Sequence, residues 1–309
     1  MIASARPEAA GECPTSHRRS RIGSPEPPVR EMTAGRPSRQ HGDPAADRGG
    51  GKRPLEAPMA VNRTGTGRAE GHRALVLRPS PAAPRAAVLL LHGGRADALE
   101  APPALDPPAV RMRPFASGIV RAAPPGLLAV GRVRYRHRGW NGPREDAVHD
   151  AREALRALLH ETGAGPVPVV LVGHSMGGRA ALRLAADPGV RGVVALAPWC
   201  PPGETVARLR DRRVIALHDP ADRVTAADDT WAYLARAAEE GAHTLGIRMP
   251  RGGHTMLRDA RSWHRITVSL TLGLLGLAPL PVPLTAPGGP PAAPLPARRV
   301  LDRIDGVAR

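Results

Sequence analysis

The chain has 309 residues, a formal net charge of +16, and a composition rich in proline (36) and glycine (34). This length is enough for one α/β domain with additional segments at its ends. A charge of this sign usually suggests a nucleic-acid partner. Here, however, the charge comes from scattered arginines, since Lys52 is the only lysine, and one Phe and two Tyr are too few to form a base-stacking platform. We therefore expect no nucleic-acid binding.

Cysteine usage and hydropathy exclude further classes of protein. Cys13 and Cys200 provide neither a disulfide framework nor metal-ligand spacing. Residues 1–58 have no apolar run behind their early arginines, so no secretory signal is expected. The longest uncharged stretch, 266–297, reaches only Ala278 before its first proline, which is too short to span a bilayer. We expect a cytoplasmic protein that does not contact a membrane.

Composition along the chain predicts three segments. Residues 1–70 are rich in Pro, Arg and Gly and lack periodicity, so we expect them to be disordered, and Met59 offers an alternative start of the protein. Residues 71–278 are expected to form one folded domain. Residues 279–309 are expected to form a Pro-rich C-terminal tail.

From residue 72 onward, short apolar runs alternate with amphipathic stretches, a pattern typical of a mostly parallel sheet with helices on both faces. The predicted strands are His72–Leu77, Ala86–Leu91, Leu127–Tyr135, Val167–Val172, Val190–Ala197, Arg213–His218 and Thr244–Met249. The predicted helices are Ala109–Ala122, Pro143–His160, Met176–Ala186, Ala226–Glu240 and Met256–Leu277. The expected fold class is α/β, with a doubly wound sheet of about seven or eight strands.

One pentapeptide carries the clearest chemical signal. Gly173-His174-Ser175-Met176-Gly177 follows a predicted strand and opens a predicted helix, which is the setting of a nucleophile elbow. Such a turn exposes the serine hydroxyl, and the amides at the start of the helix point at negative charge that forms beside it. Ser175 is therefore the candidate nucleophile.

A serine hydroxyl needs a base, commonly a histidine that a carboxylate orients. Two loops that follow later predicted strands supply these groups: one contains Asp219 and Asp222, and the other ends at His254. His254 is the expected base, with a surface-loop histidine as the alternative reading. Asp222 stands at the turn into the next helix and is favoured over Asp219 as the acid.

An oxyanion on an acyl carbon requires two fixed N–H donors. We expect the amide of Met176 to be one and that of Gly94, in the glycine-containing loop after strand 86–91, to be the other, with Arg95 as its alternative. Arg95 and Trp199 are candidate substrate contacts, and core packing is the alternative role of Trp199. Arg95 and Arg111 would suit an acidic substrate, although arginine is abundant throughout the chain.

These motifs together resemble the α/β-hydrolase superfamily over about residues 72–277. The resemblance rests on four stretches: Leu91-His92-Gly93-Gly94, Gly173-His174-Ser175-Met176-Gly177-Gly178, Asp222-Arg223-Val224 and Gly253-His254. The order of the serine, the acid and the histidine is also the order in this superfamily.

The chain is similar to small serine esterases and dienelactone-hydrolase-like proteins of that superfamily. The short segment between Trp199 and Arg213 leaves no room for the cap domain that many members carry. In one departure, many relatives have glycine where Asp219 stands, so this chain has a second carboxylate beside the proposed acid. The resemblance implies an α/β-hydrolase fold without a cap.

The sequence thus predicts a serine hydrolase that cleaves a small soluble acyl ester or thioester through an acyl-enzyme, without cofactor or metal. Acyl transfer and small-peptide hydrolysis would use the same groups. A non-catalytic binding protein of the same fold is the alternative from another class. Neither the particular substrate nor the oligomeric state follows from the sequence.

Overall fold

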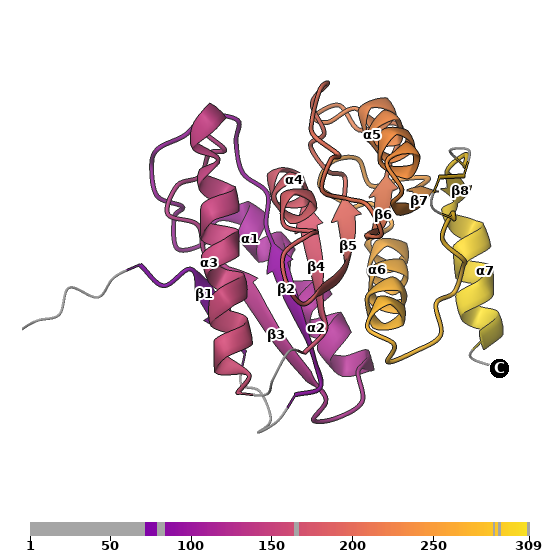
Figure 1. Cartoon of the computed structure of the whole chain (residues 1–309), viewed down its shortest axis with the longest axis horizontal. Coiled ribbons are helices and arrows are strands. Elements are labelled where there is room, and N and C mark those ends of the chain that lie inside the picture. The colour runs from indigo at the N-terminus through magenta and orange to yellow at the C-terminus, as the bar shows by residue number, and fades with distance from the viewer. Residues whose placement is uncertain (1–71, 79–83, 164–166, 287, 290–291, 308–309) are drawn as a thin grey trace, which may run out of the picture. The chain divides into compact units, whose positions relative to one another are not determined.

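The computed structural model describes residues 72–78, 84–163, 167–286, 288–289 and 292–307. The predicted N-terminal segment 1–70, including Met59, lies outside the described residues. The described part contains an eight-stranded sheet with the order β1-β3-β2-β4-β5-β6-β7-β8 (Figure 1). Only β1 and β3 pair antiparallel, and the other neighbours are parallel. The predicted fold class is confirmed.

The strands begin and end close to their predicted bounds. They are β1 (Leu75–Leu77), β2 (Ala86–Leu91), β3 (Leu128–Val133), β4 (Val169–His174), β5 (Val190–Leu196), β6 (Arg213–His218), β7 (His243–Arg248) and β8 (Leu295–Pro296). All but β8 overlap a predicted strand. The sequence signal was clear because the central strands are buried on both faces and therefore read as continuous apolar runs.

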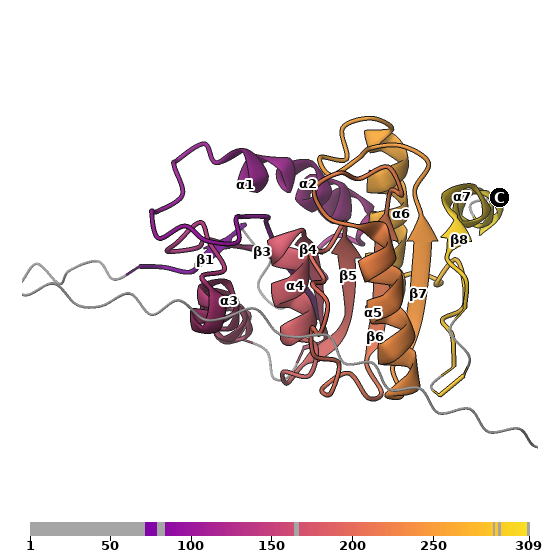
Figure 2. The same cartoon turned by 90° about the horizontal axis from the view of Figure 1, so that it is seen from above.

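Helices cover both faces of the sheet, as seen from above in Figure 2. On one face lie α3 (Asp146–Glu161), α4 (Met176–Arg183) and α5 (Ala227–Glu239). On the other lie α2 (Arg113–Ala122), which α1 (Pro107–Arg111) precedes, α6 (Ala260–Leu274) and α7 (Ala297–Val307). In β2, Leu89 and Leu91 pack into the first layer, whereas Val88 and Leu90 pack into the second. No helix of the described ranges is long and apolar enough to cross a membrane.

Three helices differ from their predicted bounds for identifiable reasons. The single helix predicted over 109–122 is two helices, because Pro114 at the start of α2 has no N–H to continue the preceding turns. The short 3-10 helix Gly142–Arg144 precedes α3. Helix α6 starts at Ala260 rather than Met256, since Met256 and Asp259 adopt positive φ values that no α-helix contains.

The prediction of a C-terminal tail over 279–309 is wrong for part of that segment. Leu295 and Pro296 form β8, which pairs with the outer strand β7, and residues 297–307 form α7. Helix α7 packs through apolar residues at helical spacing: Ala297, Val300, Leu301 and Ile304. This short amphipathic pattern was not recognised in the sequence, because it follows a Pro- and Gly-rich stretch and contains many charged residues.

The connection between β5 and β6 consists of turns and carries no cap domain, as predicted. No helix forms between Ala197 and Arg212. Instead, the buried Glu204 carboxylate forms ion pairs with Arg179 and Arg183 of α4. These contacts hold the connection against α4.

Candidate functional site

The turn between β4 and α4 places Ser175 in a strained conformation, with a φ of 54° and a ψ of −119°. The two flanking glycines are required by close backbone contacts. A Cβ on Gly173 would lie 2.3 Å from the carbonyl oxygen of Gly177, and one on Gly177 would lie 2.4 Å from that of His92. The amide of Ser175 donates to the carbonyl of Leu196 in β5, which fixes the turn to the sheet. This local geometry is that of a nucleophile elbow.

His254 reaches Ser175 from the loop after β7. Its Nε2 lies 2.9 Å from Ser175 Oγ, and its Nδ1 lies 2.9 Å from Asp222 Oδ2. Because Nδ1 donates its hydrogen to the carboxylate, Nε2 is the acceptor for the serine hydroxyl. The residues come from three separate loops at the carboxyl edge of the sheet, and the fold brings all three together.

The side chain of Asp222 is fully buried, and both of its carboxylate oxygens accept hydrogen bonds. Oδ1 accepts from the amides of Val224 and Thr225, and Oδ2 accepts from His254 and from the Thr225 hydroxyl. Burial alone would raise the pKa of Asp222, but hydrogen bonds from His218, His254 and the Val224 amide outweigh it and hold that pKa below its usual range. The carboxylate therefore stays ionised beside His254.

Asp219 has a different place in the same loop. Its Oδ2 accepts from the amide of Gly253 at 2.7 Å, and its Oδ1 accepts from the amide of Ala221 at 2.9 Å. The side chain thus holds the backbone just before His254 but does not contact the imidazole. The sequence offered both aspartates as the acid, and Asp222 is the one that accepts a hydrogen bond from His254 Nδ1.

Two residues that hold Asp222 were missed by the sequence analysis. His218, the fully buried last residue of β6, lies with Nε2 3.3 Å from Asp222 Oδ2, while its Nδ1 accepts from Thr230. Thr225 Oγ1 lies 3.1 Å from both Asp222 Oδ2 and His254 Nδ1. The position of His218, four residues before Asp222 at a strand end, was the only signal of this contact in the sequence.

His174, inside the elbow, links the nucleophile turn to the histidine loop. Its Nε2 donates to the backbone carbonyl of His254 at 2.8 Å, whereas its buried Nδ1 has no hydrogen-bond partner among the described residues. Burial, with a smaller contribution from the charge of His254, lowers the pKa of His174 to about 3. His174 is therefore a neutral structural link at neutral pH.

The two residues predicted to supply the oxyanion donors are in contact, with the side chain of Met176 against Gly94. Met176 is the first residue of α4, where amides have no partner within the helix. A Cβ on Gly94 would lie 2.4 Å from Met176 Cε and 2.3 Å from the carbonyl oxygen of Arg138, so only glycine fits there. The alternative donor, the amide of Arg95, is already hydrogen-bonded to the carbonyl of Arg138. Gly94 and Met176 therefore stay the predicted pair of donors.

A hollow of about 240 Å³ opens onto Ser175. It is lined by Gly93, Gly94, Pro107, Pro108, Arg111, His174, Ser175, Val224, His254 and Thr255. Its volume lies below the range of about 300–1,000 Å³ that is typical of sites for drug-sized ligands. The hollow therefore suits a small molecule.

The two candidate substrate contacts lie outside this hollow. Arg95 is exposed, and its backbone forms an isolated bridge with Gly139. The ring of Trp199 packs on the guanidinium of Arg179, whose carbon lies 4.5 Å from the ring centroid, and meets Trp140 edge to face. These contacts of Trp199 fit the alternative role, core packing, rather than contact with a substrate in this hollow.

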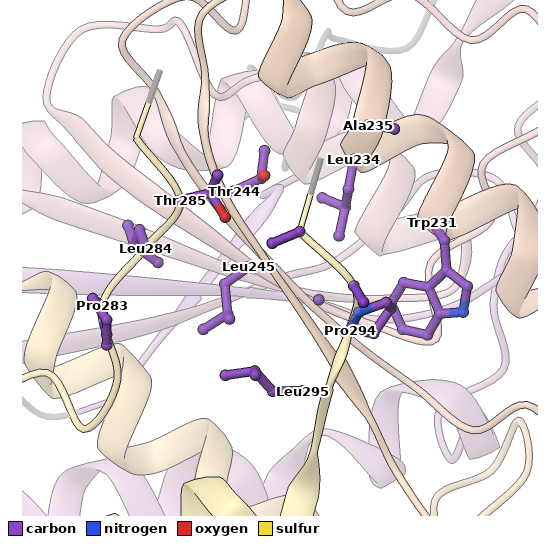
Figure 3. A pocket seen from close by; sticks show the side chains of 13 residues that line it. Trp231, Leu234, Ala235, Thr244, Leu245, Pro283, Leu284, Thr285, Pro294 and Leu295 are labelled. Carbon is purple, nitrogen blue, oxygen red and sulfur yellow. The ribbon is translucent and has the colours of Figure 1, made fainter. Parts of the chain in front are cut away.

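Another cavity, of about 280 Å³, lies along β7 and is shown in Figure 3. Its walls are mainly apolar, and its polar side-chain groups are the indole of Trp231 and the hydroxyls of Thr244 and Thr285. Among the described residues that line it, none is an acid or base suited to catalysis. The residues described in the structure also contain no group of three His, Cys, Asp or Glu side chains that could hold a metal ion. The hollow at Ser175 is therefore the candidate active site.

The lowered pKa of His174 makes a prediction about stability. A histidine with a folded pKa of about 3 against 6.5 when unfolded supports folding above pH 6.5, and this support is lost as the pH falls below that value. When the pH is lowered from 8 to 5, the free energy of unfolding of the wild type should therefore fall by about 2 kcal/mol more than that of the His174→Gln variant. Urea unfolding at both pH values measures the difference.

The matched control for this measurement is His160→Gln, since His160 is exposed at the end of α3. This control should keep the pH dependence of the wild type. An unchanged pH dependence in His174→Gln would show that the His174 imidazole does not resist protonation in the folded protein.

Comparison with known proteins agrees with this architecture. The fold is similar to a putative alpha/beta hydrolase from Agrobacterium tumefaciens, with 15% identity, a TM-score of 0.52, and coverage of 69% of this chain and 94% of the other. It is also similar to an esterase from Thermogutta terrifontis, solved with propionate bound, with 17% identity, a TM-score of 0.50 and coverage of 66% and 90%.

A search of curated protein sequences gave no match. The model of the alpha/beta hydrolase family matches residues 88–307, which include the elbow, both loops at the site and helix α7. Since this match spans most of the chain, the protein belongs to the alpha/beta hydrolase family.

Proposed function

We propose that this protein is a serine hydrolase that cleaves a small acyl ester or thioester at the hollow beside Ser175. The observation that carries the proposal is the continuous chain of hydrogen bonds from Ser175 Oγ through His254 to Asp222, with 2.9 Å at each step. A serine hydroxyl is a weak nucleophile unless a base removes its proton, and this chain supplies both a base and the carboxylate that orients it.

In the proposed reaction, Ser175 Oγ forms a bond to the acyl carbon while its proton moves to His254 Nε2. Negative charge develops on the carbonyl oxygen, which the amides of Gly94 and Met176 stabilise, each by about 2.7–4 kcal/mol in comparable sites. His254 then gives its proton to the departing alcohol or thiol, and an acyl-enzyme remains. A water molecule attacks the acyl carbon, with His254 as its base, and releases the acid and Ser175.

The ionised state of Asp222 supports this role for His254. The imidazole becomes an imidazolium during each half of the reaction, and a buried carboxylate at 2.9 Å from Nδ1 stabilises that cation. Because hydrogen bonds hold the pKa of Asp222 below its usual range, the carboxylate is charged at neutral pH.

Ser175→Ala tests the nucleophile. It removes the only atom that the mechanism bonds to the substrate, so kcat/KM for p-nitrophenyl butyrate should fall by about 10⁴-fold or more. Ser262→Ala, on α6 and outside the hollow, should stay within about twofold of the wild type. Both proteins are purified to homogeneity to remove contaminating esterases. If folded Ser175→Ala then hydrolysed the ester as fast as the wild type, Ser175 would not be the nucleophile.

Asp222→Asn and Asp219→Asn form a matched pair for the acid. The first places an amide against His254 Nδ1 and should lower kcat by about 10²–10⁴-fold, since the imidazole loses its anionic partner. The second retains an oxygen that can accept from the Gly253 amide, so its effect should stay below about tenfold. Steady-state kinetics of both variants decide between them, and the reverse ranking would assign the acid to Asp219.

A further inference from the structure

The hollow at Ser175 has an uneven distribution of charge. Among the described residues that line it, Arg111, the last residue of α1, is the only side chain with a permanent charge, and none is a carboxylate. Apart from the proposed reacting groups, most of the wall is apolar, formed by Pro107, Pro108 and Val224. A substrate in this hollow therefore meets a short apolar wall and one guanidinium.

Arg111 differs from its neighbouring arginines in how it is partnered. Arg138 forms ion pairs with Glu100 and Asp106, and Arg179 forms one with the buried Glu204. Arg111 forms no ion pair within the residues that the structure describes. Exposed unpaired arginines are common in a chain of net charge +16, but Arg111 is half-buried against the hollow.

The charge of Arg111 acts on groups inside the protein. Burial is the main cause that lowers the pKa of His174 in the elbow and of His264 on α6, and the charge of Arg111 lowers both further. Both imidazoles are therefore disfavoured as cations, and as neutral groups they leave the positive charge of the guanidinium uncompensated. A half-buried charge without a partner has lost part of its hydration, and an anion bound next to it would restore that interaction. Because the hollow is partly shielded from solvent, salt screens this interaction less than at the surface.

We propose that Arg111 selects substrates that carry a carboxylate, so that the enzyme acts on small anionic esters or thioesters. This inference rests on the proposed function, since it names the substrate class of the same site. The planar guanidinium matches a carboxylate through two parallel N–H···O bonds. The small volume and the apolar wall fit a short aliphatic link between that carboxylate and the ester.

The test compares esters of equal shape and different charge by pH-stat kinetics. Monoethyl succinate carries the carboxylate on its acyl side, and ethyl 4-methylpentanoate replaces it with a neutral group of the same branching. Butyryloxyacetate carries the carboxylate on its alcohol side instead. The wild type should prefer at least one anionic ester over the neutral ester. The preferred anionic ester then shows whether Arg111 binds a carboxylate on the acyl side or on the alcohol side.

Arg111→Gln should lower kcat/KM for the preferred anionic ester by roughly 10- to 100-fold, as expected when a hydrogen bond to a charged group is lost. The change should lie mainly in KM, because Arg111 contacts the substrate away from the reacting atoms. The neutral ester should change by less than about twofold. Arg113→Gln, on an exposed residue of α2 outside the hollow, is the matched control and should affect neither ester.

Equal losses for charged and neutral esters in Arg111→Gln, or no loss for either, would overturn the role of Arg111. Each of these results would leave the proposed function intact provided that Ser175→Ala abolishes hydrolysis of the neutral ester. If the folded wild type hydrolyses none of the three esters and does not react with an uncharged fluorophosphonate, the proposed function itself fails, and this inference fails with it.

Discussion

A single buried carboxylate, that of Asp222, accepts hydrogen bonds from several parts of the chain at once. It holds the end of β6 through His218, the start of the following helix through Thr225, and the loop after β7 through His254. A buried carboxylate without such partners would cost several kcal/mol of desolvation, so the geometry of these loops and the charge of Asp222 depend on each other. The distance between His254 and Ser175 follows from this arrangement.

Much of the fold and the core of the site could be predicted from the sequence. The buried parallel strands appear as apolar runs, and the elbow appears as glycines around Ser175 that no other residue could replace. The positions of Asp222 and His254 follow from parallel topology, since loops after neighbouring strands meet at one edge of the sheet. Topology therefore brings together residues that lie far apart along the chain.

Other features depend on three-dimensional contacts that have no local pattern. His218 looks like an ordinary strand residue until its contact with Asp222 is known, and Trp199 is placed by its packing on Arg179. The sequence named both Arg95 and Arg111 as suited to an acidic substrate, and only the structure shows that Arg111, and not Arg95, lines the hollow. Helix α7 is amphipathic, but its pattern is short and follows a Pro-rich stretch, so tertiary packing on α6 decides its structure.

The central claim is that the elbow, His254 and Asp222 together make Ser175 a nucleophile. The most direct measurement is to treat the folded protein with an uncharged fluorophosphonate and to locate the adduct by peptide mass spectrometry. We expect one stoichiometric adduct, on Ser175, whose formation slows strongly when His254 is replaced by alanine. If the folded wild-type protein formed no adduct, or formed it on a different residue, Ser175 would not be the nucleophile.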